Sequence, residues 1–198
     1  MNNELNKRVE YLFDSVNAQY IGSKELYHGN FINLIEEEYL LPNNKTIKRE
    51  RIIKNNHKES VIVIAITSDN KYILVAQNRV NNKVSLEFPS GYIEEGETYI
   101  EASTRELLEE TGYTPEAIEH LDSYYSQLGI DSSITHIVVA YNCIKKYDQS
   151  LSPNEYINYM EFTFEELQEL INGDIIKSVG NKLAFYEYTN KEKALKIK

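Results

Sequence analysis

Residues 91–113 read GYIEEGETYIEASTRELLEETGY, and this stretch decides how the rest of the chain is interpreted. From Thr98 onward it predicts a helix with a capping box. The Thr98 side chain can accept a hydrogen bond from the backbone N–H of Glu101, while the Glu101 side chain reaches back. Gly112 predicts the end of this helix, since glycine readily adopts the left-handed conformation that closes one.

The predicted helix separates charged from packing side chains. On a wheel of about 100° per residue, Glu106, Glu109 and Glu110 lie on one side and Ile100, Thr104, Leu107 and Leu108 on the other. Like charges four residues apart destabilise a helix, and negative charge near its C-terminus opposes the macrodipole. A hard divalent cation would reverse both effects. The alternative is a solvated glutamate-rich face.

The whole stretch resembles the Nudix signature. The positions that carry the likeness are Gly91, Glu97, Arg105, Glu106, Leu107, Glu109, Glu110, Gly112 and Tyr113. Only Tyr113 departs from it, because an aliphatic residue is usual there. The resemblance implies an α/β (α+β) Nudix fold, with a mixed β-sheet sandwiched between α-helices and preceded by N-terminal antiparallel strands.

The same resemblance implies a metal-dependent pyrophosphohydrolase. It implies Mg²⁺, which Mn²⁺ can replace, held by Glu106, Glu109, Glu110 and the backbone carbonyl of Ser90 against a diphosphate. Glu109 and Glu110 also count as catalytic, together with Arg105. Arg105 and Glu97 are expected to orient the carboxylates. Gly91, on the substrate side, is expected to be needed for its backbone conformation.

Three flanking segments resemble the ADP-ribose pyrophosphatase branch: Leu41-Pro42-Asn43-Asn44, Gln77-x-Arg79 and Glu87-Phe88-Pro89-Ser90-Gly91. The likeness runs from about Tyr27 to Phe185. It implies hydrolysis of ADP-ribose or a related nucleotide sugar to AMP and ribose 5-phosphate, by a homodimer whose N-terminal strands build the interface. Arg79 is expected to contact a phosphate or the terminal ribose, because a guanidinium offers planar, paired donors. The alternative is a surface salt bridge.

The general base is predicted outside the signature. The resemblance implies a glutamate on a later loop, and Glu155 in the turn Ser152-Pro153-Asn154-Glu155 is the candidate. Glu161 is the second candidate. An ordinary solvated loop carboxylate is the structural alternative for Glu155.

One departure from the branch concerns the substrate. A proline is usual about 16 residues after the last signature glycine, and this chain has Leu128 there, followed by the retained Gly129. Both are candidate substrate-binding residues. The missing proline leaves two alternatives open, namely hydrolysis of another diphosphate (a dinucleoside polyphosphate, a nucleoside triphosphate or another sugar nucleotide) and a non-catalytic Nudix regulator.

Composition narrows the remaining classes. The 198 residues carry a net charge of −10 and one cysteine. The charge argues against a nonspecific nucleic-acid surface. No leader or membrane-spanning run is visible, so we expect a cytoplasmic protein without a membrane partner. We expect residues 1–55 to form a dimerisation element and residues 56–198 the Nudix domain. Cys143 is expected to be a packed core thiol.

The periodicity of the chain predicts the remaining elements. Helices are expected over 2–16, 164–171 and much of 179–195, and strands near 20–28, 31–40, 46–53, 61–66, 71–77, 118–126, 134–144 and 157–162. Thr163 and Glu166 predict a second capping box. His136 is expected to be a hydrogen-bonded strand residue rather than a metal ligand, because no second histidine lies at metal-binding spacing.

Overall fold

The computed structural model describes residues 3–79 and 83–196 of the chain. The chain divides into two compact units. The first comprises Met1–His57 and Gln127–Ser132, and the second comprises Lys58–Ser126 and Ser133–Lys198. Within the described ranges, none of the helices is both long and apolar enough to cross a membrane.

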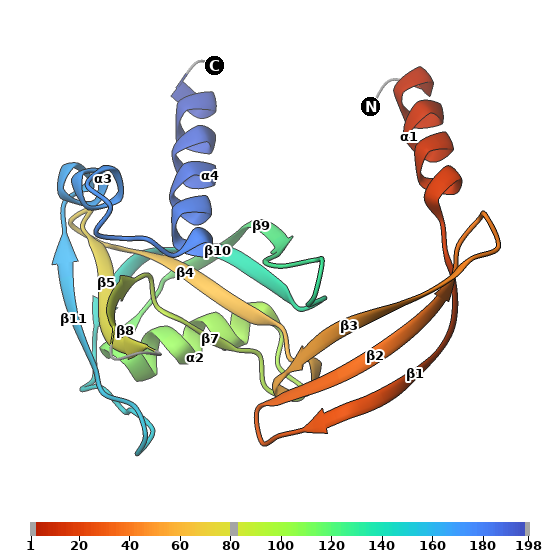
Figure 1. Ribbon diagram of the computed structural model, residues 1–198. Helices are drawn as coiled ribbons and strands as arrows, with labels where there is room; N and C mark the ends of the chain where they lie inside the picture. Colours follow the sequence, from red (N-terminus) through yellow and green to blue (C-terminus); the bar gives the residue numbers. More distant parts are fainter. Residues whose placement is uncertain (1–2, 80–82, 197–198) are drawn as a thin grey trace. The chain divides into compact units, whose positions relative to one another are not determined.

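The first unit contains one helix and a three-stranded antiparallel sheet (Figure 1). The elements are α1 (Asn3–Val16), β1 (Gln19–His28), β2 (Ile32–Leu40) and β3 (Thr46–Lys54), followed by the short turn η1 (Asn55–His57). The helix and the three strands were expected from the sequence and are confirmed. The turn at Leu41-Pro42-Asn43-Asn44 is also confirmed, since the Asn44 N–H donates to the Leu41 carbonyl at 2.9 Å and Asn44 has a φ of 61°.

A loop from much later in the chain belongs to this first unit. The Ile52 N–H of β3 donates to the Ile130 carbonyl at 2.7 Å. Lys54 forms an ion pair with the buried Asp131 at 2.5 Å, and Arg51 donates to the Ser132 hydroxyl at 3.1 Å. The segment 127–132 is therefore fixed to β3 by one backbone bond and two side-chain bonds.

The second unit is built on a mixed sheet. Its strands are β4 (Ser60–Thr67), β5 (Tyr72–Arg79), β6 (Lys83–Glu87), β7 (Ser90–Tyr92), β8 (Tyr113–Thr114), β9 (Ala117–Tyr125), β10 (Ile134–Lys145) and β11 (Ile157–Phe162). The main order is β11-β5-β4-β10-β8, with β6 on β5, β7 on β4 and β9 on β10. The β4–β10 pair is parallel and the other pairs are antiparallel. The five longer strands were expected, whereas β6, β7 and β8 were not.

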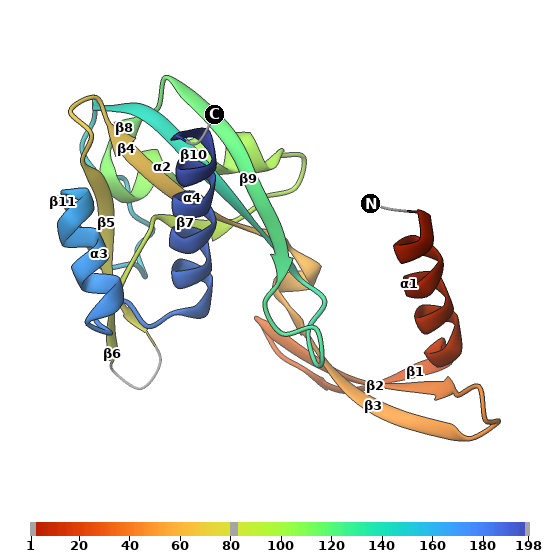
Figure 2. The same ribbon diagram turned by 90° about the horizontal axis from the view of Figure 1, so that it is seen from above.

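Helices cover both faces of this sheet, as Figures 1 and 2 show for α2 (Tyr99–Thr111) on one face and for α3 (Phe164–Asn172) and α4 (Val179–Lys196) on the other. Successive side chains of β4 point to opposite faces of the sheet and contribute to two separate hydrophobic cores. Ile62, Ile64 and Ile66 pack in the core that includes α3 and α4 residues, while the alternating residues Val61, Val63 and Ala65 pack with α2. The expected sandwich of sheet and helices is confirmed.

The helix ends follow the predicted local rules. The Thr98–Glu101 and Thr163–Glu166 capping boxes are both present. Gly112 ends α2 with a left-handed φ of 77°, and its N–H donates to the Leu108 carbonyl at 2.8 Å. Cys143 is a free thiol that is only 1% exposed, which confirms its expected place in the core.

Candidate active site

The acidic edge of α2 is more buried than the helical wheel predicted. Glu110 is only 5% exposed, whereas Ile100, expected on the packed side, is 44% exposed. Leu107 is fully buried, as expected. The cause is β7, because the backbone N–H of Ser90 donates to Glu110 Oε2 at 3.1 Å and the strand covers this carboxylate. One side of the acidic face thus lies against protein rather than solvent.

Glu106 lies against the backbone of Gly91 in β7. A Cβ atom built on Gly91 would stand 2.0 Å from the Cδ of Glu106 and 2.0 Å from its Oε1. Gly91 does not have a left-handed φ, which among the described glycines belongs to Gly96 and Gly112. The expectation that Gly91 serves its own backbone conformation was therefore wrong. Its missing side chain makes room for a carboxylate of the signature.

Arg105 connects the signature glutamates to one another. Its Nε and Nη2 donate to the two carboxylate oxygens of Glu97 at 2.7 and 2.9 Å. Its Nη1 donates to Glu106 at 2.8 Å and to Glu109 at 3.1 Å. Nη2 also donates to the carbonyl of Tyr92 at 2.8 Å. One guanidinium therefore fixes the loop before α2 and two carboxylates on the helix, in agreement with the orienting role expected for Arg105 and Glu97.

The carboxylates experience opposite electrostatic environments. The hydrogen bonds from Arg105 lower the pKa of Glu97 to about 2. Burial raises the pKa of Glu106, with smaller contributions from the negative charges of Glu109 and Glu155. Burial also raises the pKa of Glu110 to about 8, to which the charges of Glu106 and Glu155 add. Burial thus disfavours the charged forms of Glu106 and Glu110, whereas Arg105 stabilises the charged form of Glu97.

A divalent cation fits the donors of this site. Within residues 3–79 and 83–196, no three His, Cys, Asp or Glu side chains already form a preassembled metal cluster. The chemistry of the donors nevertheless suits a hard cation, because carboxylate oxygens are its preferred ligands. Burial raises the pKa of both Glu106 and Glu110, and the charge of Glu106 adds to the rise at Glu110, so a bound cation would favour their charged forms. Ser90, whose carbonyl was expected to join them, is adjacent through its N–H bond to Glu110.

Glu155 acts electrostatically on the same two carboxylates. Its negative charge contributes to the raised pKa values of both Glu106 and Glu110. The predicted turn is present, since the Glu155 N–H donates to the Ser152 carbonyl at 2.9 Å and the Glu155 carboxylate accepts from the Ser152 N–H at 3.1 Å. The catalytic role of Glu155 stays a prediction, but the fold brings its charge to the signature.

Gln149 holds the loop of Glu155 against the end of α2, and the sequence had not identified it. Its Nε2 donates to the Glu110 carbonyl at 2.5 Å and to the Ile157 carbonyl at 3.2 Å. Next to it, the Ser150 N–H donates to the Glu109 carbonyl at 2.9 Å. The Gln149 side chain is therefore hydrogen-bonded both to α2, which carries the signature glutamates, and to β11, which follows Glu155.

Glu161, the second candidate for the base, belongs to a different network. It accepts a hydrogen bond from the Tyr113 hydroxyl and lies 3.5 Å from the Lys71 ammonium. Tyr113 packs in the core beneath α2. These contacts give Glu161 a structural role at the start of β5.

Arg79 is paired with Glu87 on the neighbouring strand β6. Its Nε donates to Glu87 Oε1 at 3.1 Å, and its Nη2 bonds the other carboxylate oxygen. The Glu87 side chain is 8% exposed and that of Arg79 is 45% exposed. The positive charge of Arg79 partly offsets the rise that burial causes in the pKa of Glu110. The salt-bridge alternative is thus present, and a guanidinium fixed in this way also stands within electrostatic range of the signature.

Asn181 of α4 fixes the segment between β6 and β7, and the sequence had not singled it out. Its Oδ1 accepts the Phe88 N–H at 2.6 Å, and its Nδ2 donates to the Ser178 hydroxyl at 3.0 Å. Asn181 is 3% exposed, and Phe88 is fully buried. The position of Ser90 and Gly91 therefore depends partly on a helix on the far face of the sheet.

Leu128 and Gly129 lie in the segment of the first unit that bonds to β3. Leu128 is 66% exposed, and the space around Gly129 is open, with no atom within 4 Å of a Cβ built there. The substrate contacts expected for these two residues stay predictions.

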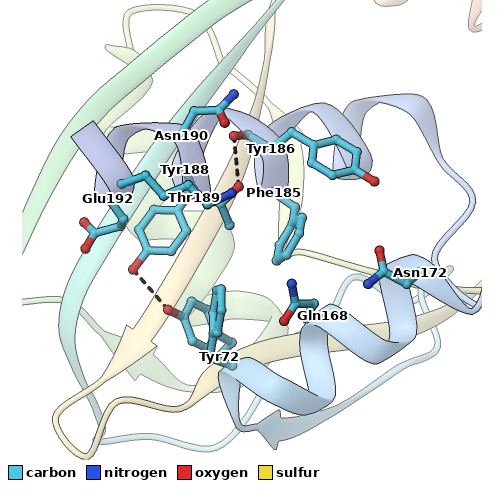
Figure 3. Close-up of a pocket in the computed structure, with 11 residues that line it drawn as sticks. Tyr72, Gln168, Asn172, Phe185, Tyr186, Tyr188, Thr189, Asn190 and Glu192 are labelled. Atoms are coloured by element: carbon cyan, nitrogen blue, oxygen red, sulfur yellow. Dashed lines mark hydrogen bonds between the residues drawn. The ribbon is translucent and has the colours of Figure 1, made fainter. Parts of the chain in front are cut away.

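A hollow of about 310 Å³ lies between α3 and α4, on the side of the sheet opposite α2 (Figure 3). Its floor is aromatic, and the Tyr72 and Tyr188 hydroxyls are hydrogen-bonded there at 3.0 Å. The floor residues Tyr72, Phe185 and Tyr188 are all less than 8% exposed. This hollow is separate from the signature carboxylates, and it is also lined by Tyr186, which is 48% exposed.

Several known proteins are similar to this chain in sequence or in fold. The NUDIX domain family model matches residues 56–179. The methanol dehydrogenase activator of Bacillus methanolicus is 34% identical over 180 residues, which cover 90% of this chain and 95% of that protein. The ADP-ribose pyrophosphatase of Bacillus subtilis (strain 168) is 33% identical over 159 residues, covering 79% and 84%.

A solved structure described as an ADP compounds hydrolase superposes with a TM-score of 0.79. It is 22% identical to this chain and covers 90% of it, and the chain covers 96% of that structure. At this level of identity the likeness is one of fold.

Proposed function

The chain belongs to the Nudix family and is a pyrophosphohydrolase, and from this premise we propose that it hydrolyses ADP-ribose, or a related nucleotide sugar, to AMP and ribose 5-phosphate. The reaction adds water across the bridging P–O bond of a diphosphate. The family assignment made from residues 91–113 is thereby confirmed, and the substrate is the step proposed here.

The observation that carries the proposal is the burial of Glu110 beside Glu106, within the electrostatic range of both Glu155 and Arg79. Two largely buried carboxylates are unfavourable in their charged forms unless a cation compensates their negative charge. A positively charged residue at the edge of the same site suits an anionic substrate. The similarity to an ADP-ribose pyrophosphatase supports the choice of substrate.

We assign the metal to Glu106, Glu109, Glu110 and the carbonyl of Ser90, with Mg²⁺ as the ion and Mn²⁺ as its substitute. When bound, such a cation neutralises the diphosphate and polarises the attacking water. Arg105 keeps Glu106 and Glu109 oriented through its paired hydrogen bonds. Gly91 leaves room for Glu106, and its backbone borders the substrate.

We assign proton transfer to Glu155 and phosphate or ribose binding to Arg79. Glu155 is placed on a loop tied to the end of α2, so it can hold the water proton while the helix carboxylates stay fixed. Arg79 presents a guanidinium whose plane is set by Glu87. A planar donor of fixed orientation suits the paired oxygens of a phosphate. Leu128 and Gly129 are the further candidates for substrate contact.

We also propose that the first unit mediates a homodimer. No residue of α1 (Asn3–Val16) is buried. Large apolar side chains on α1 and β1 are exposed: Leu5, Tyr11, Leu12, Phe13, Val16, Tyr20, Ile21, Leu26 and Tyr27. So much apolar surface in one unit is typical of a contact with a second copy.

A second candidate function follows from the 34% identity to the methanol dehydrogenase activator. In this alternative the chain acts on another enzyme. Because the signature glutamates are retained, we favour hydrolysis over this alternative. If ADP-ribose is not hydrolysed, another diphosphate compound is the next candidate substrate.

Phosphate-coupled turnover tests the proposal. Purified protein is assayed with Mg²⁺ on ADP-ribose, other nucleotide sugars, dinucleoside polyphosphates and nucleoside triphosphates. We expect AMP and ribose 5-phosphate from ADP-ribose, and a loss of at least about 100-fold in Glu110→Gln. Glu165→Gln, on the exposed first turn of α3, is the matched control. Hydrolysis is excluded if no diphosphate compound turns over or if Glu110→Gln keeps full activity.

A further inference from the structure

Two histidines lie side by side on the α2 face of the second unit. The rings of His120 and His136 are 6.0 Å apart, and Tyr99, the first residue of α2, lies 5.2 Å from one and 5.1 Å from the other. Between them stands Ser123, whose Oγ is 2.8 Å from His120 Nε2 and 2.8 Å from His136 Nδ1. Two imidazole nitrogens thus converge on a single oxygen atom.

A β-bulge creates this pair. Along β9 and β10, His136 is opposite Ser123 and Ile137 is opposite Asp122, but Val138 is opposite His120. The register shifts by one residue at this point. Since successive strand residues point to opposite faces, a regular ladder would put His120 and Ser123 on different faces. The bulge turns His120 onto the face of His136.

The bulge also explains why this histidine pair could not be predicted from the sequence. His136 was expected to be a hydrogen-bonded strand histidine, and both of its nitrogens are indeed bonded. No second histidine lies at metal-binding spacing in the sequence, as expected, yet the fold brings His120 next to His136. His120 is 16 positions away in the sequence, which is not a spacing typical of metal ligands.

The hydrogen bonds orient His136. Its Nε2 lies 2.7 Å from the carboxylate of Glu59, so Nε2 carries the proton and Nδ1 presents its lone pair. With Nε2 of His136 protonated, the Ser123 hydroxyl donates to Nδ1 of His136, and the Ser123 oxygen accepts from Nε2 of His120. Metal-binding histidines commonly have a carboxylate behind one imidazole nitrogen, and the other nitrogen of His136 faces the exposed Ser123 hydroxyl.

We propose that His120 and His136 bind a divalent transition-metal ion of the zinc class at the position now bridged by the Ser123 hydroxyl. The imidazole rings need to move by less than about 1 Å, because Zn–N bonds are about 2.0–2.1 Å long. His120 exchanges its proton to the other ring nitrogen, which frees Nε2 as a ligand. The Ser123 side chain turns to another rotamer to make room for the ion, and its oxygen and water complete the coordination.

This metal site differs from the signature carboxylates in position and chemistry. Tyr99 and Glu106 are seven residues apart on α2, or about 10 Å along the helix axis. Imidazole nitrogens favour zinc, copper or nickel, whereas clustered carboxylates favour magnesium. We therefore expect excess Mg²⁺ to fill the site formed by the signature glutamates, so that added Zn²⁺ binds at the two histidines.

Isothermal titration of metal-stripped full-length protein with Zn²⁺, in excess Mg²⁺, tests the site. We expect one Zn²⁺ bound by the parent protein and lost in both His120→Gln and His136→Gln. His28→Gln is the matched control, because His28 is an exposed strand histidine of the first unit with a glutamate partner. Glu59→Gln should weaken Zn²⁺ binding by about 10–100-fold while keeping both ligands.

A variant that binds Zn²⁺ more tightly distinguishes a metal site from a loss of binding caused by misfolding. Ser123→Cys places a thiolate, a stronger zinc ligand, between the two imidazoles, so we expect tighter Zn²⁺ binding. Cys143 does not interfere, since it is only 1% exposed. The proposal is overturned if the parent protein binds no Zn²⁺ under excess Mg²⁺, if both histidine variants retain the bound ion, or if Ser123→Cys leaves the affinity unchanged.

Discussion

The carboxylate of Glu106 occupies the space that a side chain on Gly91 would fill, with only 2.0 Å between the Glu106 Cδ and a Cβ built on the glycine. A strand residue without a side chain thereby sets the position of a proposed metal ligand on a helix. The clashing atoms are at the tip of a flexible side chain, so a substitution at Gly91 moves the carboxylate before it disturbs the fold.

Gly91→Ala should therefore reduce activity more than stability. We expect kcat to fall by about 100-fold, because displacing a catalytic group by about 1 Å costs about this much. The melting temperature should change by only a few degrees. Gly22→Ala is the control, since no atom lies within 4 Å of a Cβ at that position. Equal activity of the two variants would show that Glu106 tolerates displacement.

The ion pair between Glu97 and Arg105 predicts a pH-dependent stability. The pKa of Glu97 is about 2, below its ordinary value of 4.5, so its contribution is complete above about pH 4.5 and is lost as the pH falls toward 2. In urea unfolding of metal-free protein, the difference in midpoint between the parent and Glu97→Gln should shrink over this range. A difference that stays constant down to pH 3 would contradict the assignment.

Glu155 and Glu161 should separate in kinetics. Glu155→Gln is expected to lower kcat by about 10²–10⁴-fold, the range typical for loss of a general base, with KM little changed. Glu161→Gln removes the negative charge that pairs with Lys71 and leaves Tyr113 only an amide oxygen as acceptor, so it should lower the melting temperature and leave kcat near the parent value. The opposite pattern would transfer the role of base to Glu161.

The proposed dimer should depend on the exposed apolar side chains of α1. Phe13 is 69% exposed, and Phe13→Glu should shift the mass measured by light scattering from twice the 23.0 kDa chain mass to one chain. Val179→Glu is the control, because Val179 is 75% exposed on α4 of the other unit. A parent protein that is already one chain at micromolar concentration would exclude the dimer.

Local rules made the catalytic helix predictable. Thr98 and Gly112 determine its two ends through bonds to residues three or four positions away, and both ends are found as expected. The strands also followed from their apolar periodicity, except for β6, β7 and β8, which have five residues or fewer. Periodicity needs several repeats to be recognised, and these strands are too short to supply them.

The rest of the site depends on contacts that no local pattern encodes. Gln149 reaches a carbonyl 39 positions earlier, and Asn181 reaches an N–H 93 positions earlier. The burial of Glu110 arises from β7, which the helical wheel does not include. The approach of His120 to His136 arises from a bulge between strands. Each contact requires the three-dimensional pairing of elements before it can be recognised.

The loop of residues 127–132 has a consequence for how the chain can be divided. Because this loop belongs to the first unit, the polypeptide contributes two separate segments to that unit. A single cut after His57 would separate Ile130, Asp131 and Ser132 from the β3 residues to which they are bonded. In a fragment starting at Lys58, the Ile130 carbonyl would lose its backbone donor and the Asp131 carboxylate would lose Lys54 and become exposed to solvent. The N-terminal unit is thus not a detachable module, and its exchange between relatives would need two junctions made together.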